Sequence, residues 1–532
     1  MLPPSPKAPN PIYRSVLCLA VCLGMLQAVG TEEVISSHDV VYQVQIHTPE
    51  DVARLEAAGL SVDRITEDGA IVYVPPGKYD ALAALKLPYT PLPPPRDTKA
   101  PPGYRDYNAI TADLAGYAAA YPELTHLISL GQSVQGRELW ALRLSAAGDA
   151  EAAKPAVKYV ATMHGDEPLG TELCLYFIDW LLTDYGSDPR ITRLLDETHV
   201  WIVPLMNPDG YQIHSRFNAN GSDLNRSFPH YGEDFTDDWY DDEAGIDWEA
   251  YPTEVQHVMA WTLDNGFVLS ANMHTGELVA NYPYDAGVDI PSGMPAPTPD
   301  EQLFRRLARR YADLHPAMRE RTSPLLGFEE GIVNGSRWYR ITGSMQDWHY
   351  RYLGSKEITL ELSMIKSPSA DQLPTHWDYN AEAMLHYLEG VYQAVAGAVY
   401  DRHTGEAVWA RVRVAGNERA VYSHPESGYF HRLLDEGIHD LVVEAPGYIP
   451  YRLTAVEVET DQRSYYEIPL SDGDVNGDGS VDAVDIQLIV NAILGYDISY
   501  DADVDGGGGV SATDLQAVIN IVLGYDTTQP IP

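Results

Sequence analysis

The chain has 532 residues, 45% of them hydrophobic, so it is long enough for several domains with cores of their own. Its 35 basic residues are outnumbered by 77 acidic ones, and the resulting net charge of −42 argues against nucleic acid as a partner. No apolar run reaches the length of a confident membrane span.

Residues 1–30 have the order of a secretory signal peptide. Lys7 and Arg14 precede an apolar run, Ser15–Leu26, and small residues close the segment. Removal of this segment would leave Cys174 as the only cysteine. An exported protein without disulfides is typical of bacterial secretion, so we expect an extracellular protein of bacterial style.

Residues 31–97 predict a small α+β module of ferredoxin-like type. The proline-rich stretch from Pro88 to Pro102 follows, with basic residues Arg96 and Lys99, and we assign a linker to residues 98–103. A removable pro-segment that covers the active site and a permanent accessory domain are equally compatible with this pattern. The elements expected in the module are two strands, Val40–Ile46 and Ala70–Val74, and two helices, Pro49–Ala58 and Tyr79–Leu85.

Residues 104–392 alternate helices with apolar strands that lack a clear inside-outside pattern. Such strands predict an α/β domain with a mixed, mostly buried central sheet, flanked by helices. The apolar segments that mark this pattern are Tyr117–Tyr121, Leu139–Leu144, Val157–Met163, Leu173–Leu182, His199–Leu205, Val268–Met273 and Ile358–Leu362.

The stretch Val160–Gly170 is the centre of the functional argument. A buried strand ends here in a turn that presents His164 and Glu167. An imidazole and a carboxylate at this separation can face one Zn²⁺, and a third ligand would leave a position open for water. The pattern His-x-x-Glu is common, so a solvated turn is the alternative until other residues join the site.

Further residues of the α/β segment supply what a hydrolase of C-terminal residues needs. His274 ends an apolar strand, so it can meet His164 at the carboxyl edge of the sheet. Arg216 and Arg226 suit bidentate binding of a carboxylate, with Asn225 as an added donor. Glu361 lies between leucines on another strand, and beside metal-bound water a carboxylate has a role as general base and then acid.

These residues and their neighbours resemble a known family. The segment from Tyr104 to Tyr392 resembles zinc metallocarboxypeptidases of the carboxypeptidase A superfamily. Leu-Ser-Ala-Asn-Met-His, Val-Ala-Asn-Tyr-Pro-Tyr-Asp and Gly-Ser-Met-Gln-Asp-Trp resemble its regulatory branch, carboxypeptidases D, E, M and N. Carboxypeptidase A is itself a standard example of a His₂Glu zinc site, so the ligand set rests on the resemblance.

The resemblance implies one catalytic zinc and a role for each matching residue. The zinc ligands would be His164, Glu167 and His274, and the general base would be Glu361. Arg216 would polarise the scissile carbonyl and stabilise the oxyanion. The terminal carboxylate would be bound by Asn225 and Arg226, and Tyr339 would close over it.

Specificity is implied by a further acid. Asp285 matches the position at which the regulatory branch selects C-terminal Lys or Arg, and Gln346 would lie on the floor of the same pocket. The chain departs from the branch at Thr275, Glu277, Ser227 and Ser344, and none of these changes removes a catalytic group. Glu277 introduces a charge that can alter the pocket.

Residues 396–470 change to short alternating strands separated by turns. This pattern predicts a small β-sandwich. The regulatory branch carries a transthyretin-like sandwich directly after its catalytic domain, and the position of this segment fits it.

Residues 473–526 contain two calcium-type loops, each followed by an apolar helix, Ile486–Leu494 and Leu515–Leu523. The repeat resembles a dockerin domain, which implies calcium and a scaffold that carries cohesin modules. A calcium-stabilised tail without a partner is the alternative. Gly507 replaces a ligand in the second loop, so we expect weaker binding there. The expected calcium ligands are Asp474, Asn476, Asp478, Ser480, Asp482 and Asp485 in the first loop and Asp503, Asp505, Ser511 and Asp514 in the second.

The sequence thus predicts a secreted zinc exopeptidase that acts on peptides or proteins with a free C-terminus. An amidase or peptidase on cell-wall peptides is a second interpretation, and the carboxylate-binding residues Asn225, Arg226 and Tyr339 speak against it. A non-catalytic peptide-binding or assembly subunit is the third. That interpretation requires a lost ligand or base, and all of these residues are present.

Overall fold

The computed structural model describes residues 40–66, 68–75, 77–92, 102–146, 154–230 and 247–525. The expected signal peptide and the basic linker residues Arg96 and Lys99 lie outside the described residues. Among the helices within these ranges, none is long and apolar enough to cross a membrane.

The N-terminal module is a four-stranded antiparallel sheet with strand order β2-β3-β1-β4 and two helices. Two of its strands, β2 and β4, were not expected from the sequence. The strand β4 lies within the proline-rich stretch, and an edge position tolerates Pro91 because it needs no further ladder hydrogen bond. The elements are β1 (Val40–Val44), α1 (Pro49–Ala57), β2 (Ser61–Thr66), β3 (Gly69–Val74), α2 (Tyr79–Ala84) and β4 (Tyr89–Pro91).

The α/β part contains an eight-stranded mixed sheet with strand order β11-β10-β12-β9-β7-β8-β6-β5. Its centre, β12-β9-β7-β8, is parallel, and β10 joins β12 antiparallel. The elements are α3 (Tyr107–Ala120), β5 (Thr125–Gln132), β6 (Glu138–Leu144), β7 (Ala156–Ala161), α4 (Leu169–Asp184), α5 (Pro189–Glu197), β8 (His199–Val203), α6 (Pro208–Ile213), α7 (Thr253–Asn265), β9 (Phe267–His274), β10 (Leu278–Tyr282), α8 (Glu301–Ala312), β11 (Ile332–Asn334), α9 (Gly335–Trp338), α10 (Met345–Leu353), β12 (Lys356–Leu362) and α11 (Leu373–Leu388).

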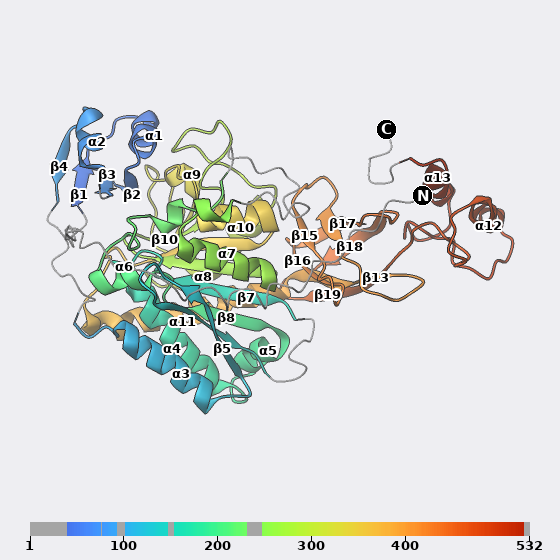
Figure 1. The fold of residues 1–532 in the computed structure, drawn as a ribbon, viewed down its shortest axis with the longest axis horizontal. Coiled ribbons are helices and arrows are strands. Elements are labelled where there is room, and N and C mark those ends of the chain that lie inside the picture. The colour runs from blue at the N-terminus through green and yellow to red at the C-terminus, as the bar shows by residue number, and fades with distance from the viewer. Residues whose placement is uncertain are drawn as a thin grey trace, which may run out of the picture. The chain divides into compact units, whose positions relative to one another are not determined.

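Helices cover both faces of this sheet, as Figure 1 shows. One core packs side chains of α3, α4, α5, α8 and α11 against the strands, and a second packs α7 and α10 against the other face. The central strand β7 is buried at all its positions, which explains its apolar sequence without alternation. The expected mixed sheet flanked by helices is confirmed, and the predicted apolar segments 117–121 and 173–182 lie in the helices α3 and α4.

The next part has two sheets that enclose one apolar core, the architecture of a β-sandwich. One sheet has the order β16-β13-β19 and the other β15-β14-β17-β18. The strands are β13 (Ala394–Asp401), β14 (Arg411–Val414), β15 (Ala420–Tyr422), β16 (Tyr429–Leu433), β17 (Gly437–Glu444), β18 (Tyr451–Val458) and β19 (Arg463–Leu470).

Two helices, α12 (Ala483–Ile493) and α13 (Ala512–Val522), follow the two acidic loops and share a small core that includes Ile489 and Val518. Each helix begins with a capping box, from Asp482 to Asp485 and from Ser511 to Asp514. The last residues of each loop therefore also form the N-terminal cap of the helix that follows.

Candidate active site

Three neighbouring strands bring the expected catalytic residues to one edge of the sheet. His164 follows β7, His274 ends β9, and Glu361 lies near the end of β12, directly opposite His274 in the parallel ladder. Glu167 stands in the turn just before α4. Because the carboxyl ends of parallel strands meet at one edge, residues far apart in the chain form a single site.

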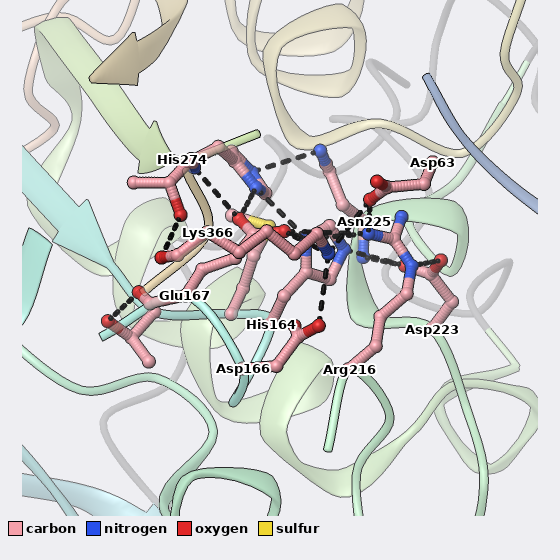
Figure 2. A network of polar contacts seen from close by, with 12 residues as sticks. Asp63, His164, Asp166, Glu167, Arg216, Asp223, Asn225, His274 and Lys366 are labelled. Atoms are coloured by element: carbon pink, nitrogen blue, oxygen red, sulfur yellow. Dashed lines mark hydrogen bonds and ion pairs between the residues drawn. The ribbon is translucent and has the colours of Figure 1, made fainter. Parts of the chain in front are cut away.

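The side chains of His164, Glu167 and His274 converge within a buried pocket (Figure 2). The Nδ1 atoms of the two histidines are 3.0 Å apart, and Glu167 Oε2 is 2.8 Å from Nδ1 of His274. One ligand atom from each residue lies within 4.8 Å of the other two. Two imidazoles and a carboxylate at this spacing fit a zinc ion with an open position, so the expected ligand set meets in space.

A carboxylate not assigned from the sequence supports these ligands. Asp223 Oδ1 lies 3.0 Å from Nε2 of His164, the ring nitrogen that faces away from the other ligands. Although burial acts to raise it, the pKa of Asp223 is held well below its usual range by Arg216 and His164. An ionised carboxylate behind a ligand histidine sets its tautomer and orientation.

The arginines and the amide expected to bind substrate lie beside the histidines. Arg216 is fully buried after α6, with Nη1 3.2 Å from Nδ1 of His164. Asn225 and Arg226 belong to a short 3-10 helix, Leu224–Arg226, and Nδ2 of Asn225 is 3.2 Å from Nε2 of His274. These donors line one cleft together with the candidate ligands.

Glu361 lies in the same cleft, between β10 and β9. Its Oε2 atom is buried and has no hydrogen-bond partner among the described residues. Burial raises the pKa of Glu361 well above its usual range, and the neighbouring carboxylates of Glu167 and Asp63 raise it further. A carboxylate of this kind, beside a candidate metal site, is suited to accept and return a proton.

The expected specificity acid also lines the cleft. Asp285 is buried, and its Oδ1 accepts a hydrogen bond of 3.0 Å from Nδ2 of Asn281. Burial raises the pKa of Asp285, and the nearby polar side chains of Ser344, Asn281 and Gln346 act against this effect. The carboxylate of Asp347, which was not assigned from the sequence, accepts the backbone N–H of Asp285 at 2.8 Å and so positions it.

The N-terminal module reaches into this cleft through its edge strand β2. The β2–β3 ladder pairs Val62 and Arg64 but skips Asp63, so Asp63 is the extra residue of a β-bulge. Its Oδ1 atom lies 2.7 Å from Nη1 of Arg216 and 2.9 Å from Nζ of Lys366 (Figure 2). Asp63 of the module thus forms ion pairs with two cationic side chains of the cleft, Arg216 and Lys366.

Backbone atoms of the same strand contact two further substrate-binding candidates. The carbonyl of Val62 accepts a hydrogen bond of 2.6 Å from Nη2 of Arg226, and the carbonyl of Asp63 accepts one of 2.6 Å from the hydroxyl of Tyr339. The cavity that remains in the cleft has a volume of about 20 Å³, room for roughly one water. The strand β2 therefore fills part of the cleft and contacts the residues expected to bind substrate.

Sequence reasoning missed the residues that position or charge-stabilise the side chains of the site without belonging to the expected set. Lys366 is an example: its Nζ atom lies 3.0 Å from Glu167 Oε1 and 3.1 Å from Asp166 Oδ2. Although burial acts to raise it, the pKa of Glu167 is held well below its usual range by Lys366 and the two histidines. The one available signal was position, since Asp223 precedes Asn225 closely in an assigned motif and Lys366 follows Glu361 closely.

The two acidic loops near the C-terminus differ in their geometry. In the first, both oxygens of Asp474 accept backbone N–H groups, including those of Gly477 and Gly479. In the second, Asp503, Asp505 and Asp514 offer ligand atoms that lie within 4.8 Å of one another. Burial raises the pKa of Asp503, and Asp514 and Asp505 raise it further, a repulsion that a divalent cation would relieve.

Fold and site together define a class of protein. A metal-dependent hydrolase of this kind needs two imidazoles and a carboxylate to bind the ion, together with a second carboxylate and a guanidinium nearby. The cleft contains all of these groups. The donors that line the cleft suit a substrate with a terminal carboxylate.

Comparison with known proteins identifies the family. Residues 110–383 match the family described as zinc carboxypeptidase, and residues 472–523 match the dockerin type I domain. The chain is 38% identical over 362 residues to the carboxypeptidase N catalytic chain of Mus musculus, covering 63% of this chain and 78% of that protein. It is 37% identical over 348 residues to carboxypeptidase SOL1 of Arabidopsis thaliana, covering 65% and 68%.

A longer relative and a solved structure extend the comparison. The chain is 37% identical over 399 residues to carboxypeptidase D of Drosophila melanogaster, but it spans only 27% of that protein. The fold is similar to the carboxypeptidase A structure from Helicoverpa armigera, with a TM-score of 0.50 and 17% identity over 67% of this chain and 97% of the other. The chain therefore belongs to the zinc carboxypeptidase family, and it carries a dockerin type I domain.

Proposed function

We propose that this protein is a secreted zinc metallocarboxypeptidase that removes the C-terminal residue of peptides or proteins. One observation carries the proposal: the ligand atoms of His164, Glu167 and His274 meet within 4.8 Å, in the cleft that also contains Arg216 and Glu361. The family implies zinc, and the buried nitrogen and carboxylate donors fit this ion.

Each residue of the cleft has a task in this reaction. Bound zinc supplies Lewis acidity and lowers the pKa of water. Glu361 accepts a proton from the attacking water and returns it to the leaving amine. Arg216 donates to the oxyanion that develops at the scissile carbonyl. Asn225 and Arg226 bind the terminal carboxylate, and Tyr339 closes over it once its hydroxyl no longer donates to Asp63.

The first test is amino-acid release from two matched peptides that end in Arg or in Phe, each with zinc and with a chelator. The assay uses protein cut between the module and residue 104, so that the module does not block the cleft. Chelator-sensitive release of either amino acid would support the enzyme, and release of neither would refute it. A cell-wall amidase would instead act on peptides without a free C-terminus. A peptide-binding subunit would bind both peptides without turnover.

We propose further that Asp285 gives a preference for C-terminal Lys or Arg, with Gln346 on the floor of the pocket. We expect Asp285→Ala to lower kcat/KM for Arg-terminated peptides about 30-fold or more, since it removes a buried partner of the substrate cation. Cleavage of Phe-terminated peptides should change much less. Because the pKa of Asp285 is raised, the preference should also fade as pH falls through that pKa and the carboxyl is protonated.

The matched control for this prediction is Asp313→Ala, which removes an exposed acid at the end of α8. It should leave both peptides unaffected. An equal loss for Arg-terminated and Phe-terminated peptides in Asp285→Ala would mean that Asp285 supports the structure of the cleft and does not select the substrate.

The segment 31–97 is proposed to be a pro-segment that keeps the enzyme latent. Support comes from the contacts of Asp63 with Arg216 and of its carbonyl with Tyr339, and from the small volume left in the cleft. Cleavage within residues 98–103 would allow the module to leave.

The β-sandwich at 396–470 is proposed to be transthyretin-like, because of its two-sheet architecture and its position after the catalytic domain.

The dockerin domain is proposed to bind two calcium ions and to tether the enzyme to a scaffold that carries cohesin modules. We expect calcium to stabilise this part by about 2.7 kcal/mol per site at a hundredfold excess over Kd, because the ion binds the folded loops only. Calorimetric titration should show two steps. Asp474→Ala should remove the tighter one and Asp503→Ala the weaker one, in which Gly507 lacks a ligand side chain.

The reverse assignment of the two steps would contradict the role given to Gly507. A titration without any binding would contradict calcium altogether. Chelator-treated wild-type protein and the Asp472→Ala variant, which changes an acid that precedes the first loop, serve as controls.

A further inference from the structure

Glu277 is an acid of the cleft with no role in the reaction described above. It lies in the turn between β9 and β10, it is buried, and it lines the same pocket as the candidate zinc ligands. Its Oε1 accepts hydrogen bonds from Nη2 of Arg321 at 2.6 Å and from the backbone N–H of Leu278 at 3.0 Å. Within the part of the chain that the structure describes, Oε2 makes no hydrogen bond.

The strand β10 places Glu277 and the Asp285 pocket on opposite sides of Glu361. In the β10–β12 ladder, Val279 pairs with Glu361 and Asn281 pairs with Thr359. Asn281 holds Asp285, whereas Glu277 precedes the strand at its other end. At roughly 3.3 Å per residue the two ends are separated by about 13 Å, with the catalytic carboxylate between them.

This order determines which substrate residue each acid meets. In the proposed mechanism the bond to be cut lies at Glu361, and the residue that is released extends toward Asp285. The residue before it must extend the other way, toward Glu277. The two acids therefore face neighbouring residues of a bound peptide, one on each side of the scissile bond.

The module itself places a cation at this end of the cleft. Arg64 follows Asp63 on β2 and lines the same pocket. Its Nη1 atom lies 2.8 Å from the point that a Cβ atom on Gly276 would occupy, so it reaches the residue next to Glu277. The glycine at 276 leaves room for a long basic side chain there.

We propose that Glu277 selects a basic residue immediately before the residue that is released, so that the preferred substrates end in two basic residues. This proposal rests on the proposed carboxypeptidase function and deepens it. Arg321 offsets part of the charge of Glu277, but it contacts only Oε1, and Oε2 stays available to a guanidinium or ammonium group. The substrate cation would replace Arg64 once the module moves away.

The test uses the full chain after proteolytic cutting between the module and residue 104, with Asp63→Ala and Arg64→Ala so that the side chains of the module do not compete for the cleft. Peptides ending in Ala-Arg, Arg-Arg and Glu-Arg are compared by kcat/KM. We expect Arg-Arg to exceed Ala-Arg about fivefold to tenfold, and Glu-Arg to be the poorest of the three. In the added presence of Glu277→Gln or Glu277→Ser the ratio of Arg-Arg to Ala-Arg should fall to about one.

Two further readouts separate this role from a structural one. The preference should shrink as ionic strength rises, because it is a charge interaction near the surface of the cleft. Glu320→Gln, which neutralises an exposed acid near Arg321 in the chain, should leave the ratio unchanged. Equilibrium binding of the same peptides to a Glu361→Gln form measures the preference without turnover.

The outcomes distinguish the two proposals. A ratio that stays the same in Glu277→Gln and Glu277→Ser, or equal affinities of Arg-Arg and Ala-Arg peptides, would overturn the role of Glu277. Preferential binding of Arg-Arg peptides without any release of arginine would support Glu277 while refuting the carboxypeptidase function.

Discussion

Replacement of Glu361 by glutamine is expected to lower kcat by about 10³-fold or more while the protein keeps its zinc and its fold. The amide has nearly the shape of the carboxylate but cannot accept the proton of the attacking water. Glu361 is not one of the three residues whose ligand atoms converge, so metal binding does not depend on it. Replacement also removes a buried carboxyl whose Oε2 has no hydrogen-bond partner among the described residues, so stability should not suffer.

The measurement combines kcat with zinc content per chain, determined on the same preparation. The matched control is Glu329→Gln, which makes the same chemical change at a largely exposed glutamate outside the cleft. Undiminished turnover of the Glu361→Gln protein with zinc bound would remove Glu361 from the mechanism. Loss of zinc together with activity would show instead that it takes part in holding the metal.

Release of the N-terminal module is expected to raise activity by about 10²-fold or more, because the proposed pro-segment would keep substrate out of the cleft until the module leaves. Loss of the module frees Arg216, Arg226 and Tyr339 from β2 at once. The change Asp63→Ala in the full chain should raise activity less, about tenfold, since the backbone contacts of β2 remain.

The experiment compares three forms on one Arg-terminated peptide: the full chain, the full chain cut by a protease between the module and residue 104, and the Asp63→Ala variant. Asp68→Ala, which changes an exposed acid at the turn between β2 and β3, is the control and should behave as the full chain. Equal activity of the cut and uncut chain would make the module a permanent accessory domain. Circular dichroism before and after cutting verifies that the catalytic part stays folded.

The affinity of the module for the cleft should also depend on ionic strength and on the positive charge of Lys366. Asp63 is buried between Arg216 and Lys366. If one of these ion pairs is broken inside the protein, the two buried charges have neither water nor a partner, which costs free energy. Apolar packing of Val62 with Trp338, Tyr339 and Ile341 adds a contact that salt does not weaken. Ionic strength alone should therefore activate the full chain only in part.

Local sequence patterns were sufficient for much of the fold. The apolar run of β7 and the strand that ends at His274 were expected from sequence because a strand buried on both faces needs apolar residues throughout. The strand β2, Ser-Val-Asp-Arg-Ile-Thr, was missed because a bulge interrupts its alternation of buried and exposed residues. The same bulge is what directs Asp63 into the cleft.

The candidate site divides in the same way. The sequence predicts His164, Glu167, His274 and Glu361, because each stands at a strand end or in a turn with a residue type that zinc hydrolysis requires. No local pattern of this kind marks Asp223, Lys366 or Asp347. Each of them contacts a site residue that is far away in the sequence, and only the folded chain brings the two together. A pairwise contact of this kind has no local sequence pattern.

The sequence by itself determined the class of chemistry, the likeness to zinc carboxypeptidases and the dockerin domain that follows the catalytic part, because ligand types, turn residues and apolar periodicity are local properties of the chain. Only the tertiary structure decided that Asp63 binds Arg216 and Lys366, and that Glu277 and Asp285 lie on opposite sides of Glu361. Both facts depend on sheet register and on the approach of separate elements. Those are long-range properties, set by the packing of the whole chain and not by any stretch of it.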